Sequence, residues 1–174
     1  MTAASFWIKP ASWVEPSDSD RLDIIECLGK EPRGEYQIVV LGKNNEPLVI
    51  ENAPFFMDGT PMPTRYWLVD PTLVAEVSRV ESTGGVKQVQ DEIDDEVIVR
   101  IHDRYAQQRD GLIATEYDGP RPSAGVGGTR KGVKCLHAHV AHYLATGADE
   151  VGQWTMQKIA DLQGDTLQRA KGDQ

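Results

Sequence analysis

The sequence is short of cysteine and of long apolar runs, and each shortage excludes a class of protein. Its two cysteines, Cys27 and Cys135, lie far apart in a chain of 174 residues, so a disulfide framework is not expected. No stretch reaches the roughly 20 apolar residues that a membrane-spanning helix needs. Residues 1–9 lack a basic segment followed by an apolar one and do not resemble a secretion signal. We therefore expect a cytoplasmic protein.

Positive charge is also scarce. The chain has 18 Lys and Arg against 27 Asp and Glu, which gives a formal net charge of −9 at pH 7. Such a surface repels phosphate backbones and anionic lipids, so general binding to nucleic acid or to membranes is not expected. Residues 119–134 are an exception, since they contain four basic side chains and no carboxylate. A small anionic ligand could bind there.

Composition and pattern together predict one domain of the α+β class. Hydrophobic residues make up 40% of the chain and charged residues 26%, as in ordinary globular proteins. We expect residues 1–16 to form an irregular arm that packs its aromatic side chains onto the domain, and residues 17–170 to form the globular domain. Short β-branched segments at 36–41, 47–50 and 66–69 predict strands, and the turn signal at residues 42–45 predicts that the first two form a hairpin. The expected fold is a small antiparallel sheet near the N-terminal half, packed by about four to five helices.

Helices are predicted where apolar residues recur at spacings of three and four. Ser17 and Asp70 supply side chains that can cap the N-termini of two of them. In the last helix, Trp154, Ile159 and Leu162 are expected to face the core. The predicted helices cover residues 17–29, 70–84, 86–105, 131–146 and 152–170. Residues 97–99, within the third of these, are β-branched, so a strand there is the main alternative.

Three of the four histidines and one of the two cysteines lie within residues 132–143. If these residues form a helix at about 100° per residue, Cys135, His139 and His142 share one face, and His137 lies at the edge of the apolar face. Thiolate and imidazole groups suit zinc or another transition metal. All three on one ion would be strained, because seven helical positions span about 10 Å. The candidate metal ligands are Cys135, His137, His139 and His142, with His102 or the acidic run 91–96 as candidates for any remaining ligand.

An anion site is the second interpretation of this region. A glycine-rich loop precedes the predicted helix, and the free N–H groups of a helix N-terminus favour phosphate or carboxylate. The candidate residues are Gly127, Gly128, Arg130 and Lys134, although their spacing does not match a P-loop. In the first turn of such a helix, the Cys135 thiol would have a lowered pKa. It could then act as a nucleophile with a histidine as its base, in a phosphate-handling enzyme.

The third interpretation assigns no ligand to the segment. The imidazoles would be hydrogen-bonded within the structure, and Cys135 would pack as a small apolar residue. The protein would then be a non-catalytic interaction protein that docks a partner through exposed aromatics such as Trp7, Trp13 and Trp154. Stoichiometric metal would favour the first interpretation, bound phosphate the second, and a dry, buried cluster the third.

Three segments carry a family resemblance: residues 29–34, residues 58–68, and residues 133–142 with their Lys-Cys-Leu-His core. In order and spacing they resemble the uncharacterised bacterial, mainly actinobacterial, family called domain of unknown function 501. The resemblance extends over about residues 20–155. It implies no particular activity, but it points to Cys135, His137 and His142 as the functional set. That set favours His137, whereas the helical face favoured His139.

Overall fold

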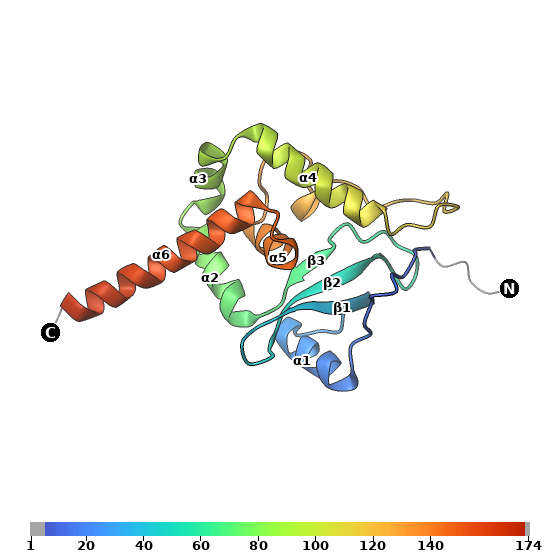
Figure 1. Ribbon diagram of the computed structural model, residues 1–174, viewed down its shortest axis with the longest axis horizontal. Coiled ribbons are helices and arrows are strands. Elements are labelled where there is room, and N and C mark those ends of the chain that lie inside the picture. Colours follow the sequence, from blue (N-terminus) through green and yellow to red (C-terminus); the bar gives the residue numbers. More distant parts are fainter. Residues whose placement is uncertain (1–5, 173–174) are drawn as a thin grey trace.

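The computed structural model describes residues 6–172, and the side chains of residues 6–164. Figure 1 shows a small sheet beside a group of helices, with one long helix extending away from both. The predicted α+β class is confirmed. None of the described helices combines the length and the apolar character that crossing a membrane requires. The elements in chain order are α1 (Asp18–Leu28), β1 (Gly34–Leu41), β2 (Pro47–Phe56), β3 (Tyr66–Leu68), α2 (Pro71–Ser82), α3 (Gly85–Glu92), α4 (Asp95–Asp110), the 3-10 turn η1 (Val126–Gly128), α5 (Leu136–Thr146) and α6 (Glu150–Gly172).

The sheet has three antiparallel strands in the order β1-β2-β3, so the predicted hairpin and third strand are confirmed. Strand β2 is longer than predicted and ends at Phe56. Side chains of neighbouring strand residues point to opposite faces of a sheet. Ile50 therefore packs with Ile24 of α1, whereas Val49 packs in the larger core that contains Val140 of α5. Helices α1 and α5 thus cover opposite faces.

The two predicted helix starts are confirmed by their caps. Ser17 and Asp20 form a reciprocal capping box at the start of α1, and Gly29 ends that helix in the left-handed conformation at φ 69°. Asp70 accepts the backbone N–H of Leu73 at 2.7 Å at the start of α2. Local side-chain chemistry therefore fixes both boundaries.

The helix predicted over residues 86–105 is two helices, so the described residues form six α-helices instead of four to five. Ile93 is extended between them, at φ −108° and ψ 129°. Asp95 and Glu96 then occupy the first turn of α4, where carboxylates interact favourably with the helix dipole. Within one uninterrupted helix the same acidic run would be repulsive.

The helix predicted over residues 131–146 begins later, at Leu136. Gly132 is in the left-handed region at φ 64°, which interrupts a right-handed helix. Cys135 is extended and is the N-cap residue of α5. The expected face of Cys135, His139 and His142 on one helix is therefore wrong, because Cys135 lies outside the helix.

The described part of the N-terminal arm packs its aromatic side chains onto the domain, as predicted. Trp7 and Trp13 are both buried, with ring centroids 4.9 Å apart, and Trp7 forms a β-bridge with Ile113. Trp154 is partly buried, and its indole N–H donates to Glu92 at 2.7 Å. The expectation that these tryptophans are exposed for docking is wrong, since each is already packed or hydrogen-bonded within the chain.

Candidate functional site

The structure separates the four candidate metal ligands into two groups. Cys135 and His137 lie at the start of α5, half-buried beside Glu81 of α2. His139 and His142 are one and two turns further along α5 and are fully buried. We call Glu81, Cys135 and His137 the Cys–His–Glu cluster. It is the one group of at least three such side chains with metal-compatible spacing among the described residues.

The donor atoms of the Cys–His–Glu cluster converge on one point. Cys135 Sγ lies 3.9 Å from His137 Nδ1, and His137 Nδ1 lies 3.3 Å from Glu81 Oε1. One donor atom from each residue lies within 4.8 Å of the other two. The short Cys-x-His spacing achieves this because Cys135 is extended while His137 is already in the first helical turn.

Glu81 contacts the N-terminus of α5 as well as His137. Its Oε1 accepts the backbone N–H of Leu136, the first residue of α5, at 2.7 Å. The preceding loop is fixed from α3, since the backbone N–H of Val133 donates to Gln90 Oε1 at 2.6 Å. The first turn of α5 therefore already has an anionic partner, supplied by the chain itself.

The other ring nitrogen of His137, Nε2, is hydrogen-bonded to α2. Nε2 lies 3.1 Å from the carbonyl oxygen of Val74 and 3.1 Å from Ser78 Oγ. A carbonyl can only accept, so Nε2 carries the proton. In the neutral imidazole, Nδ1 then keeps its lone pair and faces Cys135 and Glu81.

Without a metal, the cluster favours charged forms of both cysteine and histidine. Burial alone would raise the pKa of Cys135, but hydrogen bonds from His137 and from the backbone N–H of Ala138 outweigh it and lower that pKa below 9.0. The hydrogen bond with Cys135 raises the pKa of His137 to about 9, with help from Val74 and Glu81 and against burial. A thiolate is the form of cysteine that binds metals and attacks electrophiles.

The second group is a buried cluster of His139, His142 and Asp149, whose side chains are all 0% exposed. Asp149 precedes α6 and accepts Nδ1–H from His139 at 2.9 Å and from His142 at 2.8 Å. It also accepts the backbone N–H of Gly152 at 2.9 Å. The two histidine hydrogen bonds lower the pKa of Asp149 to about 2, against the opposing effect of burial. This cluster joins α5 to α6 and does not reach Cys135.

Two of the other ligands considered from the sequence, His102 and Glu92, are engaged elsewhere. His102 accepts the backbone N–H of Val126 at Nδ1 and donates from Nε2 to the carbonyl of Gly132 at 2.9 Å. It fixes the glycine loop against α4 and has no free nitrogen. Within the acidic run, Glu92 is bonded to Trp154.

The anion site proposed for the glycine loop lacks the helix start it requires. Gly127 and Gly128 belong to the short turn η1, and α5 begins well after them. Both glycines have positive φ, at 65° and 76°. Arg130 and Lys134 are exposed on the following segment. The backbone N–H that a phosphate would take at the start of α5 is bonded to Glu81.

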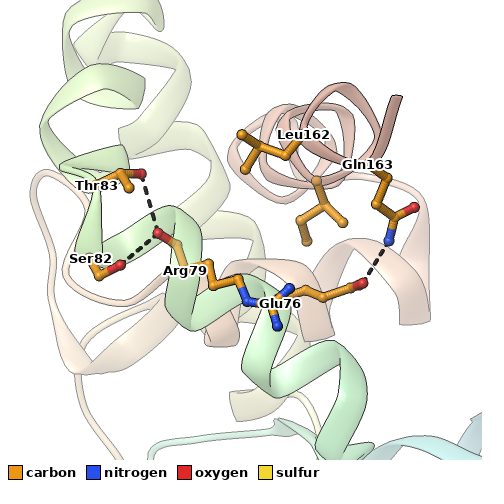
Figure 2. A pocket seen from close by; sticks show the side chains of 7 residues that line it. Glu76, Arg79, Ser82, Thr83, Leu162 and Gln163 are labelled. Atoms are coloured by element: carbon orange, nitrogen blue, oxygen red, sulfur yellow. Dashed lines mark hydrogen bonds between the residues drawn. The ribbon is translucent and has the colours of Figure 1, made fainter. Parts of the chain in front are cut away.

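Among the cavities that the described residues form, two lie outside the Cys–His–Glu cluster. The larger, of about 690 Å³, lies between α2 and α6, and Figure 2 shows the residues that line it. The smaller, of about 320 Å³, is bordered by His102, Arg109 and Arg130. Arg109 is buried, and its guanidinium donates to carbonyl groups of the 122–124 loop. Neither cavity includes Cys135.

Sequence reasoning missed the two carboxylates that organise these groups. Glu81 is one of many acidic side chains and lies on a different helix from Cys135. Asp149 follows the glycine that ends α5, a position typical of an N-cap. That signal could have identified Asp149 as a cap, but not its contacts with two histidines. No local pattern singles out Glu81.

Comparison with known proteins gives one match. A family model described as "Protein of unknown function (DUF501)" matches residues 39–157. This range includes the Cys–His–Glu cluster and the buried histidines. No curated protein and no solved structure matches the chain.

Proposed function

The chain belongs to the DUF501 family of proteins of unknown function, and we propose that its Cys–His–Glu cluster binds a divalent transition metal, with zinc as the best fit. The observation that carries this proposal is the convergence of a thiol, an imidazole nitrogen and a carboxylate within 4.8 Å of one another. These are the three side-chain donors that zinc uses in proteins.

The spacing of the donor atoms supports a tetrahedral ion. With metal–ligand bonds of about 2.0 to 2.3 Å, neighbouring ligand atoms of a tetrahedral site lie about 3.3 to 3.8 Å apart. The distances here are 3.3 Å from His137 to Glu81 and 3.9 Å from His137 to Cys135. The donors of Cys135 and Glu81 lie within 4.8 Å of each other, and side-chain rotation would bring this third pair to the same range when an ion binds. Glu81 can keep its bond to Leu136, because a carboxylate has several lone pairs.

The surroundings of His137 also match those of a metal ligand. Histidines that bind metals usually donate their other ring N–H to a carbonyl or a carboxylate, which fixes the ring and its tautomer. His137 does so through Nε2 to Val74. Three protein ligands in a half-buried position leave the fourth open to water or to a small molecule, as in catalytic zinc sites. The free thiols of Cys27 and Cys135 support a cytoplasmic location.

The test is metal content and metal-linked stability of the untagged protein. We expect near-stoichiometric zinc by elemental mass spectrometry, and a higher melting temperature when zinc is added back to chelator-treated protein. Cys135→Ser should abolish both effects. Glu81→Gln should weaken zinc binding by at least about ten-fold, while its amide oxygen still accepts the Leu136 N–H and preserves the helix cap.

Cys27→Ser is the matched control, because it removes the other free thiol at a part-buried site in α1. It should leave zinc content unchanged. Metal-free protein whose melting temperature does not respond to zinc would contradict the proposal. So would a Cys135→Ser variant that binds zinc as the parent protein does.

A nucleophilic thiol is the second candidate, favoured by the lowered pKa of Cys135 and the raised pKa of His137. A thiolate beside an imidazolium is the arrangement that activates cysteine in hydrolases and transferases. We rank this function second, because it rests on two pKa shifts, whereas the metal site rests on three converging donor atoms.

A further inference from the structure

The smaller cavity lies where the chain turns back on α4. After this helix the chain reverses, so that residues 122–126 lie beside it (Figure 1). Two buried side chains of α4 hold the returning loop: Arg109 donates to the carbonyl of Ala124 at 2.9 Å, and His102 accepts the backbone N–H of Val126 at 3.1 Å. The cavity between α4 and this loop measures about 320 Å³. Small-molecule sites range upward from about 300 Å³, so the space suits a small ligand.

The loop wall of the cavity is fixed in one conformation. Ala124 has φ 64° and is one of two non-glycine residues with positive φ in the described part of the chain. The left-handed region is strained for a residue with a Cβ, and such strain persists where surrounding contacts impose it, commonly at ligand sites. Gly125 packs so closely on α4 that an added Cβ would lie 2.5 Å from His102 Cβ. The cavity is therefore largely formed before a ligand binds, which favours binding.

Arg109 contributes a buried cation to the cavity, and one of its N–H groups is unused. The residue is 1% exposed, and its guanidinium carries five N–H groups. Nε donates to Asp110 at 2.8 Å, and Nη1 donates to the carbonyls of Pro63 and Ala124. Nη2 has two N–H groups but a single acceptor among the described residues, the carbonyl of Pro122 at 3.4 Å. A buried donor without an acceptor is unfavourable, so an oxygen atom of a ligand would be stabilised there.

The charges that line the cavity are of both signs. Arg130 of the loop and Asp103 of α4 are exposed, and neither side chain forms a hydrogen bond or ion pair with the residues that the structure describes. With Arg109 and Asp110 they give the lining two cations and two carboxylates. The carboxylates oppose a purely anionic ligand, and the arginines oppose a purely cationic one. A ligand that carries both charges is attracted by both.

We propose that this cavity binds a small zwitterion with the ammonium and carboxylate groups of a free α-amino acid. Its carboxylate accepts N–H groups of Arg109 and Arg130, and its ammonium group donates to Asp103, so that each contact is charge-assisted. Ala106 also lines the cavity and offers an apolar surface for a short side chain such as that of L-alanine. Metal binding is not required, since no residue of the Cys–His–Glu cluster lines this cavity.

Titration of the full chain with L-alanine, followed by two-dimensional amide NMR, tests the proposal. We expect saturable shifts of the backbone signals of Gly125 and Arg130. Propionate lacks the ammonium group and ethylamine lacks the carboxylate. Each should bind at least about ten-fold more weakly than L-alanine, because each loses a charge-assisted contact and leaves charges of the cavity unmatched.

Arg130→Gln and Asp103→Asn test the two ends of the ligand separately. Both side chains are exposed and unpaired among the described residues, so both variants should fold as the parent protein does. Arg130→Gln should raise the dissociation constant for L-alanine by about ten-fold, and Asp103→Asn should remove the preference for L-alanine over propionate. Lys131→Gln is the matched control, because Lys131 is exposed on the same loop but does not line the cavity. It should leave the dissociation constant unchanged.

Three outcomes would overturn the proposal. Absence of saturable shifts with L-alanine would show that the cavity does not bind this class of ligand. Equal affinity for L-alanine and propionate would show that the ammonium group is not recognised. An Arg130→Gln variant that binds L-alanine as the parent protein does would place the binding outside the cavity. Unchanged amide spectra of the ligand-free variants, apart from signals near the substitution, would confirm that the substitutions act on binding and not on folding.

Discussion

Replacing Asp149 with alanine should remove a large part of the stability of this protein. The Asp149 carboxylate is 0% exposed and accepts three N–H groups, from His139, His142 and the backbone of Gly152. The variant leaves these three donors buried without an acceptor, and each such donor costs about 1 to 3 kcal/mol. We expect the free energy of unfolding to fall by about 4 kcal/mol, out of the roughly 5 to 15 kcal/mol of a typical domain.

The dependence of stability on pH provides an independent signature of the same carboxylate. Its pKa is 3.8 when unperturbed and about 2 in the folded protein. A depressed pKa means that the folded state holds the proton less tightly than the unfolded state. The stabilisation is therefore complete above about pH 4 and disappears as pH falls toward 2, and it amounts to about 2 kcal/mol. The Asp149→Ala variant has no such carboxylate, so between pH 4 and pH 2 it should lose about 2 kcal/mol less than the parent protein does.

The assay is urea unfolding followed by circular dichroism, repeated at a series of pH values. Asp23→Ala is the control, because Asp23 is exposed on α1 and should change the free energy of unfolding by less than about 0.5 kcal/mol. A loss of under about 1 kcal/mol in Asp149→Ala would refute the reasoning, since it would mean that the three donors find other acceptors. If the variant lost as much free energy of unfolding between pH 4 and pH 2 as the parent protein does, the lowered pKa of Asp149 would be refuted.

Two further predictions concern packing and thiol chemistry. In the same urea unfolding assay, Gly152→Ala should destabilise the protein by about 3 kcal/mol, because the new Cβ would lie 2.3 Å from the carbonyl oxygen of His139. Gly164→Ala is the control: its Cβ meets nothing within 4 Å, and the substitution should stabilise the helix slightly. In chelator-treated protein near neutral pH, iodoacetamide should alkylate Cys135 about ten-fold faster than Cys27, whose pKa is raised by burial, and zinc should protect Cys135. Peptide mass spectrometry measures both rates, and equal rates would contradict the pKa directions.

The features that were predicted correctly depend on neighbours in the sequence. A capping box at Ser17, a capping aspartate before a proline at position 71, and two β-branched segments around a turn each involve a few consecutive residues. Hydrophobic periodicity also located α5 and α6. It could not locate the start of α5, because the apolar spacing of three and four already begins at Val133, before the helix starts at Leu136.

The candidate site was predicted only in part, because its geometry depends on contacts between distant elements. The sequence identified Cys135, His137, His139 and His142 as candidate ligands, but its helical spacing placed Cys135 on one face with His139 and His142 and left His137 off that face. The structure places Glu81 of α2 in that group instead. Which carboxylate faces a given histidine is decided by how helices pack, and a single sequence contains no local record of that packing.

The double engagement of Glu81 restricts how this position can change during evolution. One carboxylate meets the first backbone N–H of α5 and also lies beside the imidazole of His137. Glutamine can replace the first contact but not the charge, and aspartate is shorter by a methylene group. Substitutions acceptable for one contact are therefore excluded by the other. Among relatives that keep Cys135 and His137, we expect position 81 to remain glutamate, because only glutamate satisfies both contacts. Relatives that have lost Cys135 and His137 should tolerate glutamine at position 81.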